Sequence, residues 1–352
     1  MVKCMNKMES LFLHTVGSLS EGMEKSGLYK ILRKRSKKEV IMLMYHGITA
    51  KKDAVTNFDN KHVYIEKFEK QLAYVKENYN LISFEDFILW HKGEKEIPDN
   101  AIILTFDDGY KNTYTNLFPL LQKYNAPAII FLPTAYIGKK EIAWYDIVAY
   151  AIANTKEHKI TIGGKDYVLD SDKTKKAVSA EIKAKIRVPK KRAEIITGLI
   201  KETKCNLATV ADEDVLFLSW KECAEMAKKS VTFGAHGVAH ESFLVLSEQE
   251  KRREVEDSKQ EIEKKGYSVT SFAYPFGAGD DDTLLKEAGY SAGLTTEYGR
   301  NTRKTNIMRL HRICVTDMYD LPIFVLNIFV RFPSFHYLLV KTYARLRLMI
   351  KL

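Results

Sequence analysis

The sequence predicts an α/β protein whose parallel strands close into a barrel. Short aliphatic runs alternate with longer segments in which apolar residues recur at helical spacing. Acidic, histidine or aromatic residues directly follow several of these runs, and α/β barrels gather their sites where strands end. The chain has 352 residues, which suits one large α/β domain with additions, or two domains.

The predicted elements alternate along the chain. Val40–Tyr45 is the first predicted strand and places His46 at its end, either as a site residue or as a partner of a neighbouring loop. Ser83 precedes a helix as an N-cap, and Ser247 with Glu250 forms the pattern of a capping box. Further strands are expected at 101–106, 128–132, 230–235, 270–277, 289–295 and 309–315, and helices at 65–75, 113–124, 193–203 and 246–266.

The strand predicted at 101–106 is followed by two adjacent carboxylates and a glycine. Alternation along a strand sends Asp107 and Asp108 in different directions, so the two acids can hold separate roles instead of sharing one proton. Gly109 lets the backbone turn away at once. Asp-Asp-Gly is also ordinary turn chemistry at a strand end, so by itself it leaves a purely structural reading open.

Two histidines, His236 and His240, follow the strand predicted at 230–235. If the chain is helical there, a spacing of four places both rings on one face, as a shared divalent cation requires. Two histidines and one carboxylate are a common catalytic ligand set that leaves coordination positions open. A further strand end, at 270–277, supplies an aromatic loop stiffened by Pro275.

In combination these motifs resemble the signature motifs of the polysaccharide deacetylases, the chitooligosaccharide-deacetylase-like group of carbohydrate esterases (family four). The resemblance covers roughly residues 39–154 and 211–320, and it implies a distorted barrel of seven or so strands. Met44-Tyr-His-Gly-Ile48 also resembles the opening strand of a branch that acts on surface and biofilm polysaccharides. The matching motifs are Thr105-Phe-Asp-Asp-Gly109, His236-x-x-x-His240 and Phe272-Ala-Tyr-Pro-Phe-Gly277.

The resemblance implies metal-dependent hydrolysis of an N-acetyl group on an amino sugar of a polysaccharide, oligosaccharide or glycan precursor. It places Asp108, His236 and His240 around one divalent metal ion, with zinc as the default and cobalt, manganese or iron as alternatives. It makes Asp107 the general base and the backbone N–H of Phe276 a donor to the oxyanion.

The general acid is the irregular part of the match. The family often places a histidine in a Leu-x-His motif near its last strand, whereas Leu310 and His311 are adjacent here. A shift of one residue reverses the face of a strand, so His311 could point away, and His46 is the other candidate. The predicted substrate-binding residues are Tyr110, Tyr274, Pro275, His46 and Trp144, with core packing as the alternative for Trp144.

Two other functions stay open, namely a carbohydrate-binding or regulatory protein that keeps the fold without turnover, and a hydrolase of a non-sugar amide. The sequence has neither a Gly-x-x-x-x-Gly-Lys-Ser/Thr phosphate loop nor the Gly-x-Ser-x-Gly elbow of serine hydrolases. Its four cysteines are far apart, which argues against a disulfide framework and predicts free thiols.

The net charge of +10 is concentrated in appendages. Residues 1–38 hold nine lysines and arginines against three glutamates, residues 155–210 hold fourteen against seven acids, and residues 321–352 hold five against none. We predict a basic helical extension at 1–38, a barrel at 39–320 with an insertion at about 155–210, and a basic amphipathic tail at 321–352. Because the core is acidic, we expect no nucleic acid partner.

The role of each appendage has alternatives. The insertion is expected to cap the substrate, to form a basic docking surface, or to be merely tolerated. The tail fits peripheral contact with a membrane, or packing on the barrel or on a partner chain, and no run reaches the ~20 apolar residues of a membrane span. Residues 1–38 lack a convincing secretion signal, which predicts a cytoplasmic protein, with a peripheral position at the inner face of the membrane as an option.

Overall fold

The computed structural model describes residue 22 and residues 38–329, apart from 53, 208–209, 211–212, 278 and 280. The predicted extension at 1–38 and the tail beyond residue 329 therefore lie outside the described residues, and their character stays a prediction. The cytoplasmic location, inferred from residues 1–38, also stays a prediction. Within the described ranges, no helix has both the length and the apolar character needed to cross a bilayer.

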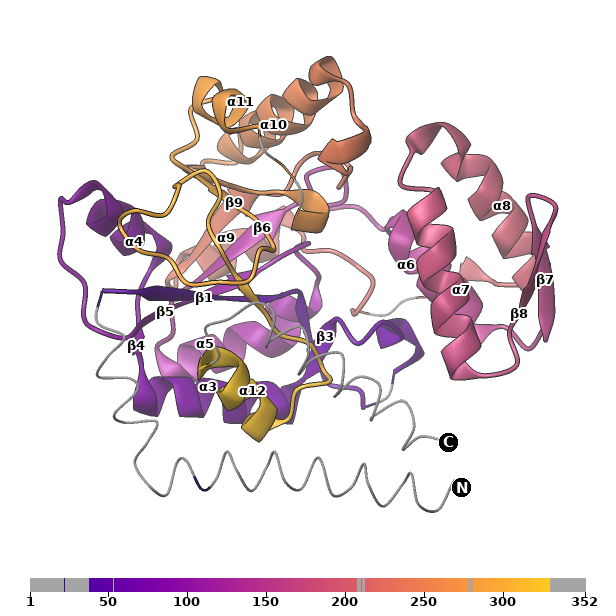
Figure 1. The fold of residues 1–352 in the computed structure, drawn as a ribbon, viewed down its shortest axis with the longest axis horizontal. Coiled ribbons are helices and arrows are strands. Elements are labelled where there is room, and N and C mark those ends of the chain that lie inside the picture. Colours follow the sequence, from indigo (N-terminus) through magenta and orange to yellow (C-terminus); the bar gives the residue numbers. More distant parts are fainter. Residues whose placement is uncertain are drawn as a thin grey trace.

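The described residues form a curled sheet of seven parallel strands in the order β11-β10-β9-β6-β5-β1-β12 (Figure 1). Leu310, just before β12, pairs with Leu294 in β11, so the chain links the two ends of this order. The predicted distorted barrel is thus confirmed. The strands are β1 (Val40–Tyr45), β5 (Ala101–Phe106), β6 (Ala128–Leu132), β9 (Val231–Ala235), β10 (Ser271–Ala273), β11 (Ala292–Leu294) and β12 (Ile313–Cys314), and the short β4 (Asn80–Leu81) also pairs with β5.

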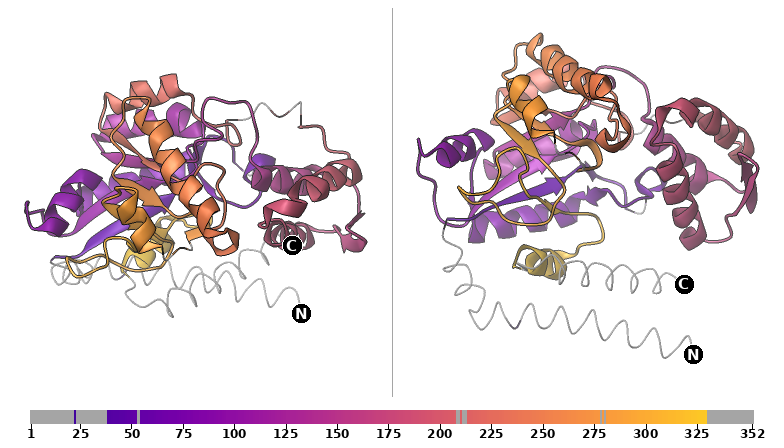
Figure 2. Two further views of the ribbon diagram at one scale, coloured as in Figure 1. Left: turned by 90° about the horizontal axis from the view of Figure 1, so that it is seen from above. Right: turned by 45° about the horizontal axis from the view of Figure 1, so that its top comes forward.

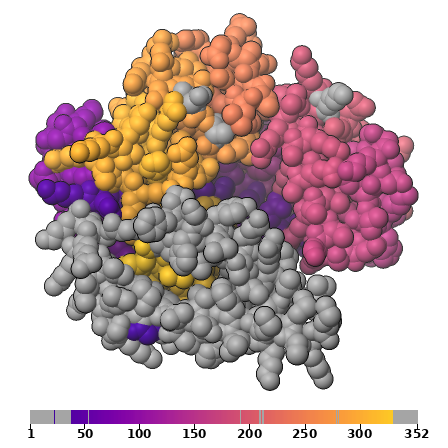
Figure 3. Space-filling model, viewed as in Figure 1, coloured from indigo at the N-terminus to yellow at the C-terminus, as the bar shows by residue number. Residues whose placement is uncertain are grey.

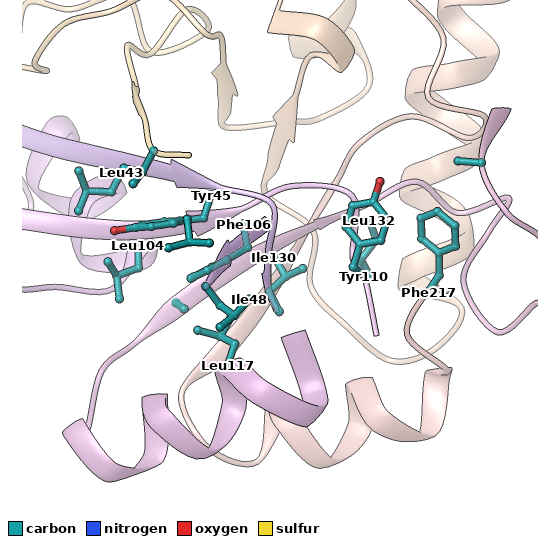
Figure 4. Packing of buried hydrophobic residues seen from close by; sticks show 14 of the residues in the cluster. Leu43, Tyr45, Ile48, Leu104, Phe106, Tyr110, Leu117, Ile130, Leu132 and Phe217 are labelled. Carbon is teal, nitrogen blue, oxygen red and sulfur yellow. The ribbon is translucent and has the colours of Figure 1, made fainter. Parts of the chain in front are cut away.

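The strands read as continuous apolar runs because both faces of the sheet are covered. Alternate residues of β1 enter different clusters, with Leu43 and Tyr45 in the larger one and Val40 and Met42 in the smaller. The ring of Tyr45 stacks on Phe106 with centroids 5.3 Å apart. Figure 4 shows this part of the larger cluster between the strands and the helix that follows β5.

Helices cover the sheet, mostly at the predicted places, and the helix at Trp220–Ala227 was not predicted. Ser83 caps α4 by accepting from the Asp86 N–H, and Ser247 with Glu250 forms the predicted capping box of α10. The segment predicted as a helix at 113–124 begins with a π-helical turn, Thr113–Leu117, before α5. The covering helices are α3 (Ile65–Asn78), α4 (Phe84–Lys92), α5 (Phe118–Tyr124), α9 (Trp220–Ala227), α10 (Glu248–Glu263) and α11 (Asp282–Glu287).

The first part of the predicted tail is a helix, α12 (Leu321–Phe329), which packs against α3. It buries Phe324, Val325 and Ile328 in the larger cluster. Arg300 fastens its end by donating from Nη2 to the Ile328 carbonyl at 2.7 Å. This section of the tail therefore packs on the barrel, which was one of the alternatives.

The insertion forms a lobe beside the sheet, which Figures 1 and 2 show from three directions and Figure 3 shows as a separate bulge of the surface. Its residues pack against α6, the helix that precedes the predicted insertion, so we describe α6 together with it. We call residues 144–203 the lobe. It consists of α6 (Trp144–Asn154), the hairpin of β7 (Lys159–Ile162) and β8 (Lys165–Val168), α7 (Asp172–Lys185), the short turn Pro189–Lys191 and α8 (Arg192–Thr203).

Candidate active site

The two aspartates are separated by a sharp turn at the end of β5. The backbone N–H of Asp107 donates to the Tyr45 carbonyl at 2.9 Å, so this residue still continues the strand. Asp108 and Gly109 then both have a positive φ, of 73° and 65°. A Cβ at Gly109 would lie 2.7 Å from Leu132 Cδ2, which explains the glycine. The turn gives the two carboxylates different neighbours, as the sequence predicted.

Asp108 faces both histidines of the second motif. Its Oδ1 lies 3.4 Å from His236 Nε2 and 3.2 Å from His240 Nε2. All three residues are buried, and their potential ligand atoms lie within 4.8 Å of one another. Asp108 Oδ1 has no hydrogen-bond donor among the described residues. A buried carboxylate oxygen that faces two imidazole nitrogens and lacks a donor fits a divalent cation site.

The two histidines lie on a loop. The sequence analysis expected both rings on one face of a helix, but no helix forms there. Gly237 and His240 have positive φ angles of 73° and 55°. The Glu254 carboxylate of α10 holds the loop by accepting from the Val238 N–H at 2.8 Å and the Ala239 N–H at 3.1 Å. His236 Nδ1 lies 2.7 Å from the Ala273 carbonyl, and as the donor there it leaves Nε2 free to bind a metal.

Several charges act on the histidine pair and its loop. Burial alone would lower the pKa of His236, but the Asp107 and Asp108 carboxylates outweigh it and hold this pKa above its ordinary value. Burial raises the pKa of Glu254 to about 7, although the backbone N–H groups that it accepts oppose this shift. The site therefore joins carboxylates and imidazoles whose protonation states depend on one another.

Asp107 has a partner that the sequence analysis missed. Arg312, next to β12, donates from Nη1 to Asp107 Oδ1 at 2.7 Å and from Nη2 to Oδ2 at 2.8 Å. Its Nε donates to the Thr295 carbonyl at 2.8 Å, and its side chain is fully buried. Burial would raise the pKa of Asp107, but the charge and hydrogen bonds of Arg312, together with the charges of His236 and His46, more than offset this, so the pKa of Asp107 lies below its usual value.

His311 points away from the site, and the structure contradicts its candidacy as the general acid. Its Nδ1 lies 3.6 Å from Glu297 Oε2, and its side chain is 32% exposed. Because successive residues of an extended chain face opposite ways, Arg312 takes the inward position in place of His311. The sequence signal for Arg312 was a charge on the same alternating face of the strand as Leu310 and Cys314, where burial demands a partner.

His46, the other candidate for the acid, lies close enough to both aspartates for their charges to act on it. Burial lowers the pKa of its imidazole, Asp108 and Asp107 raise it, and the net effect is a lowered pKa. Its Nδ1 is buried and has no hydrogen-bond partner among the described residues.

Aromatic side chains line the site beside His240. The His240 ring lies 4.8 Å from the Tyr145 ring and 4.7 Å from the Phe276 ring, between centroids. Phe276 belongs to the turn Pro275–Gly277, has a positive φ of 58°, and contacts Trp144 at 5.9 Å. Trp144 and Tyr145 come from α6, so the lobe contributes to the site.

Two of the predicted substrate contacts, Tyr110 and Tyr274, have no exposed surface in this structure. Tyr110 is fully buried, donates to Asp146 Oδ2 at 2.7 Å and stacks on Phe217. Tyr274 is equally buried and packs against Phe243 and Phe272. Both tyrosines support the site from behind. Pro275 is also buried, next to Gly237 of the histidine loop.

A parallel, distorted barrel with a buried aspartate and two histidines at its strand ends defines the class of protein. The chain belongs to the polysaccharide deacetylase family, because the family model described as polysaccharide deacetylase matches residues 94–293. A putative polysaccharide deacetylase of Bacillus subtilis, YxkH, is 22% identical over 279 residues, which are 78% of this chain and 71% of the relative. The poly-beta-1,6-N-acetyl-D-glucosamine N-deacetylase of Staphylococcus epidermidis is 30% identical over 116 residues, or 30% of this chain and 39% of that protein.

Solved structures show the same fold. The Streptococcus pyogenes deacetylase PplD in complex with acetate has a TM-score of 0.56 at 20% identity, over 84% of this chain and 99% of that one. IcaB from Ammonifex degensii has a TM-score of 0.54 at 16% identity, over 83% of this chain and 96% of that one.

Proposed function

We propose that this chain is a metal-dependent carbohydrate N-deacetylase that hydrolyses the N-acetyl group of an amino sugar in a polysaccharide, oligosaccharide or glycan precursor. The observation that carries the proposal is the buried Asp108 Oδ1, which faces His236 Nε2 and His240 Nε2 and lacks a donor among the described residues. The relatives named as N-deacetylases of poly-beta-1,6-N-acetyl-D-glucosamine support N-acetylglucosamine as the sugar.

Asp108, His236 and His240 would hold the metal ion, with zinc as the default. A divalent cation in such a site polarises an amide carbonyl and lowers the pKa of water, which together overcome the low reactivity of an acetamide. Asp107 is the general base that accepts the proton of the attacking water. Arg312 positions this base, because its two hydrogen bonds fix the plane of the carboxylate and keep it ionised.

His46 is the proposed donor to the leaving amine. Both aspartates act on its ring, and burial lowers its pKa, so a proton accepted there is readily passed on. The backbone N–H of Phe276 is the proposed donor to the oxyanion, since the left-handed turn at Phe276 lies against His240.

Acetate release from β-1,6- and β-1,4-linked N-acetylglucosamine oligomers by the metal-loaded protein tests the proposal. Asp107→Asn should lower turnover by roughly 10²- to 10⁴-fold, as expected for loss of a general base, while the metal content stays at the wild-type value. Asp108→Asn should lose the metal. Tight binding of these oligomers without any acetate release would favour the alternative of a carbohydrate-binding protein.

A further inference from the structure

The lobe is fastened to the loop that carries the metal ligands. Arg192, at the start of α8, donates from Nη1 and Nη2 to the two carboxylate oxygens of Glu241 at 2.5 and 2.7 Å, and Glu241 directly follows His240. The guanidinium of Arg192 also lies over the Trp144 ring, 4.5 Å from its centroid. This contact is bidentate and mostly buried, so it fixes the lobe relative to the site.

The same arginine also binds the backbone directly after the end of α7. Arg192 Nε donates to the Ile186 carbonyl at 2.9 Å, and its Nη2 donates to the Arg187 carbonyl at 3.0 Å. On another side of the lobe, Lys183 pairs with Asp59, and the Lys176 ammonium lies over the Phe58 ring. Arg192 thus holds the backbone of residues 186–187, and α7, which precedes them, is tied to residues 58–59.

Arg187 reaches the aromatic wall of the site from this turn. Its guanidinium carbon lies 4.7 Å from the centroid of the Phe276 ring, and that ring contacts His240 at 4.7 Å. Arg187 Nε is buried and has no hydrogen-bond partner among the described residues. A buried N–H without an acceptor is costly, so such a group points to an acceptor that arrives with a ligand.

The other cations near the site have carboxylate partners. Arg192 pairs with Glu241, Lys61 pairs with the buried Asp146, and Arg312 pairs with Asp107. None of the described carboxylates forms an ion pair with Arg187. Its charge is therefore available to a ligand, and the contact with the Phe276 ring holds the guanidinium beside the aromatic side chains of the site.

We propose that Arg187 binds an anionic oxygen group, a carboxylate or a phosphate, on the sugar chain whose acetamide lies at Asp108, His236 and His240. The substrate class is then an anionic N-acetylated glycan. This inference rests on the proposed deacetylase function and deepens it. Arginine suits the role because its planar fork matches carboxylate and phosphate oxygens.

Binding of three probes to the full chain, measured by calorimetry, tests the inference without turnover. The probes are the neutral N-acetylglucosamine tetramer, N-acetylglucosamine 1-phosphate and a hyaluronan tetrasaccharide that carries glucuronate carboxylates. Preference for the second or third probe distinguishes phosphate from carboxylate. In Arg187→Gln, affinity for the preferred charged probe should fall roughly 10- to 100-fold, while affinity for the neutral tetramer stays within about twofold.

Two variants serve as controls. Lys190→Gln removes a positive charge from the same segment and should leave the preference intact, because the Lys190 side chain is exposed to solvent. Arg187→Lys keeps the charge but loses the stacked fork, and it should recover only part of the affinity. Thermal melting of each variant shows that the fold is kept.

The inference is overturned if Arg187→Gln weakens the charged and neutral probes by the same factor, or weakens neither. It is also overturned, with the proposed function left standing, if the wild-type protein releases acetate from the neutral tetramer and shows no preference for either charged probe. Failure of the metal-loaded wild-type protein to bind or deacetylate any probe would instead refute the proposed function, and the inference with it.

Discussion

Replacing Arg312 with methionine tests whether Arg312 keeps Asp107, the proposed general base, ionised. The variant removes both hydrogen bonds to the carboxylate and leaves a buried aspartate without a counter-charge. Breaking a buried ion pair by removing one partner costs about 3–5 kcal/mol, so the free energy of unfolding at neutral pH should fall by this amount. The measurement is urea denaturation of the metal-free protein, so that metal binding does not mask the change.

A double variant separates the charge from the packing. In Asp107→Asn/Arg312→Met the uncompensated charge is gone, so this protein should be more stable than Arg312→Met alone by about 1–3 kcal/mol. Arg252→Met is the matched control, because Arg252 pairs with Glu256 and Glu287 on the surface. It should cost less than about 1 kcal/mol.

The stabilisation by the Asp107–Arg312 pair should depend on pH in a definite direction. Since Arg312 lowers the pKa of Asp107, the stabilisation from this pair is present above the ordinary aspartate pKa and is lost as the pH falls through the lowered value. The gap between wild type and Arg312→Met should therefore narrow below pH ~3.9. The reasoning is refuted if Arg312→Met costs no more than Arg252→Met at neutral pH, or if the double variant is no more stable than the single one.

Three further predictions concern His46, His236 and the loop that joins His236 to His240. His46→Gln should lower kcat for acetate release by roughly 10²- to 10⁴-fold while His311→Gln stays near wild type; equal rates for His46→Gln and wild type would remove His46 as the acid. Metal affinity measured by titration should fall as the pH drops through the raised pKa of His236, because protons compete with the metal for the imidazole nitrogen. A metal affinity that does not change between pH 8 and pH 5 would contradict this. The pKa of Glu254, raised to about 7, means that its contribution to stability is present below its ordinary pKa and lost as the pH rises through about 7. In the wild type this loss should lower the free energy of unfolding by up to about 3 kcal/mol, as measured by denaturation curves, and in Glu254→Gln it should be absent. If the same loss persists in Glu254→Gln, another group causes it.

The sequence was sufficient for the strands of the barrel and for the motifs at their ends, but not for α6, α9 or the hairpin of β7 and β8. The strands β1, β5 and β6 have the predicted bounds, because buried parallel strands are uninterrupted apolar runs that end at a polar residue. Asp108, His236 and His240 meet because the ends of parallel strands share one edge of the sheet. The metal and the roles of the site residues stay predictions.

Side-chain direction was harder to predict than position in the chain. His311 and Arg312 are neighbours, and which of them faces inward depends on the register by which 310–314 joins β11 to β1. Tyr110 and Tyr274 follow strands as site residues do, yet each turns into the core. Within the lobe, Trp144 was among the predicted site residues, but Arg187 was not, since it meets Phe276 only through contacts between segments far apart in the sequence.

Arg312 lies late in the chain, so during synthesis it is added after the other residues of the site. All three residues that face one another as potential metal ligands are complete once synthesis has reached residue 240, whereas the guanidinium that orients Asp107 is added seventy-two positions later. A nascent chain that has folded up to β11 would have the three potential ligands, but Asp107, the proposed base, would lack its counter-ion, and the link between Leu294 and Leu310 would not yet exist. Completing the barrel and pairing Asp107 with Arg312 are thus the same folding event.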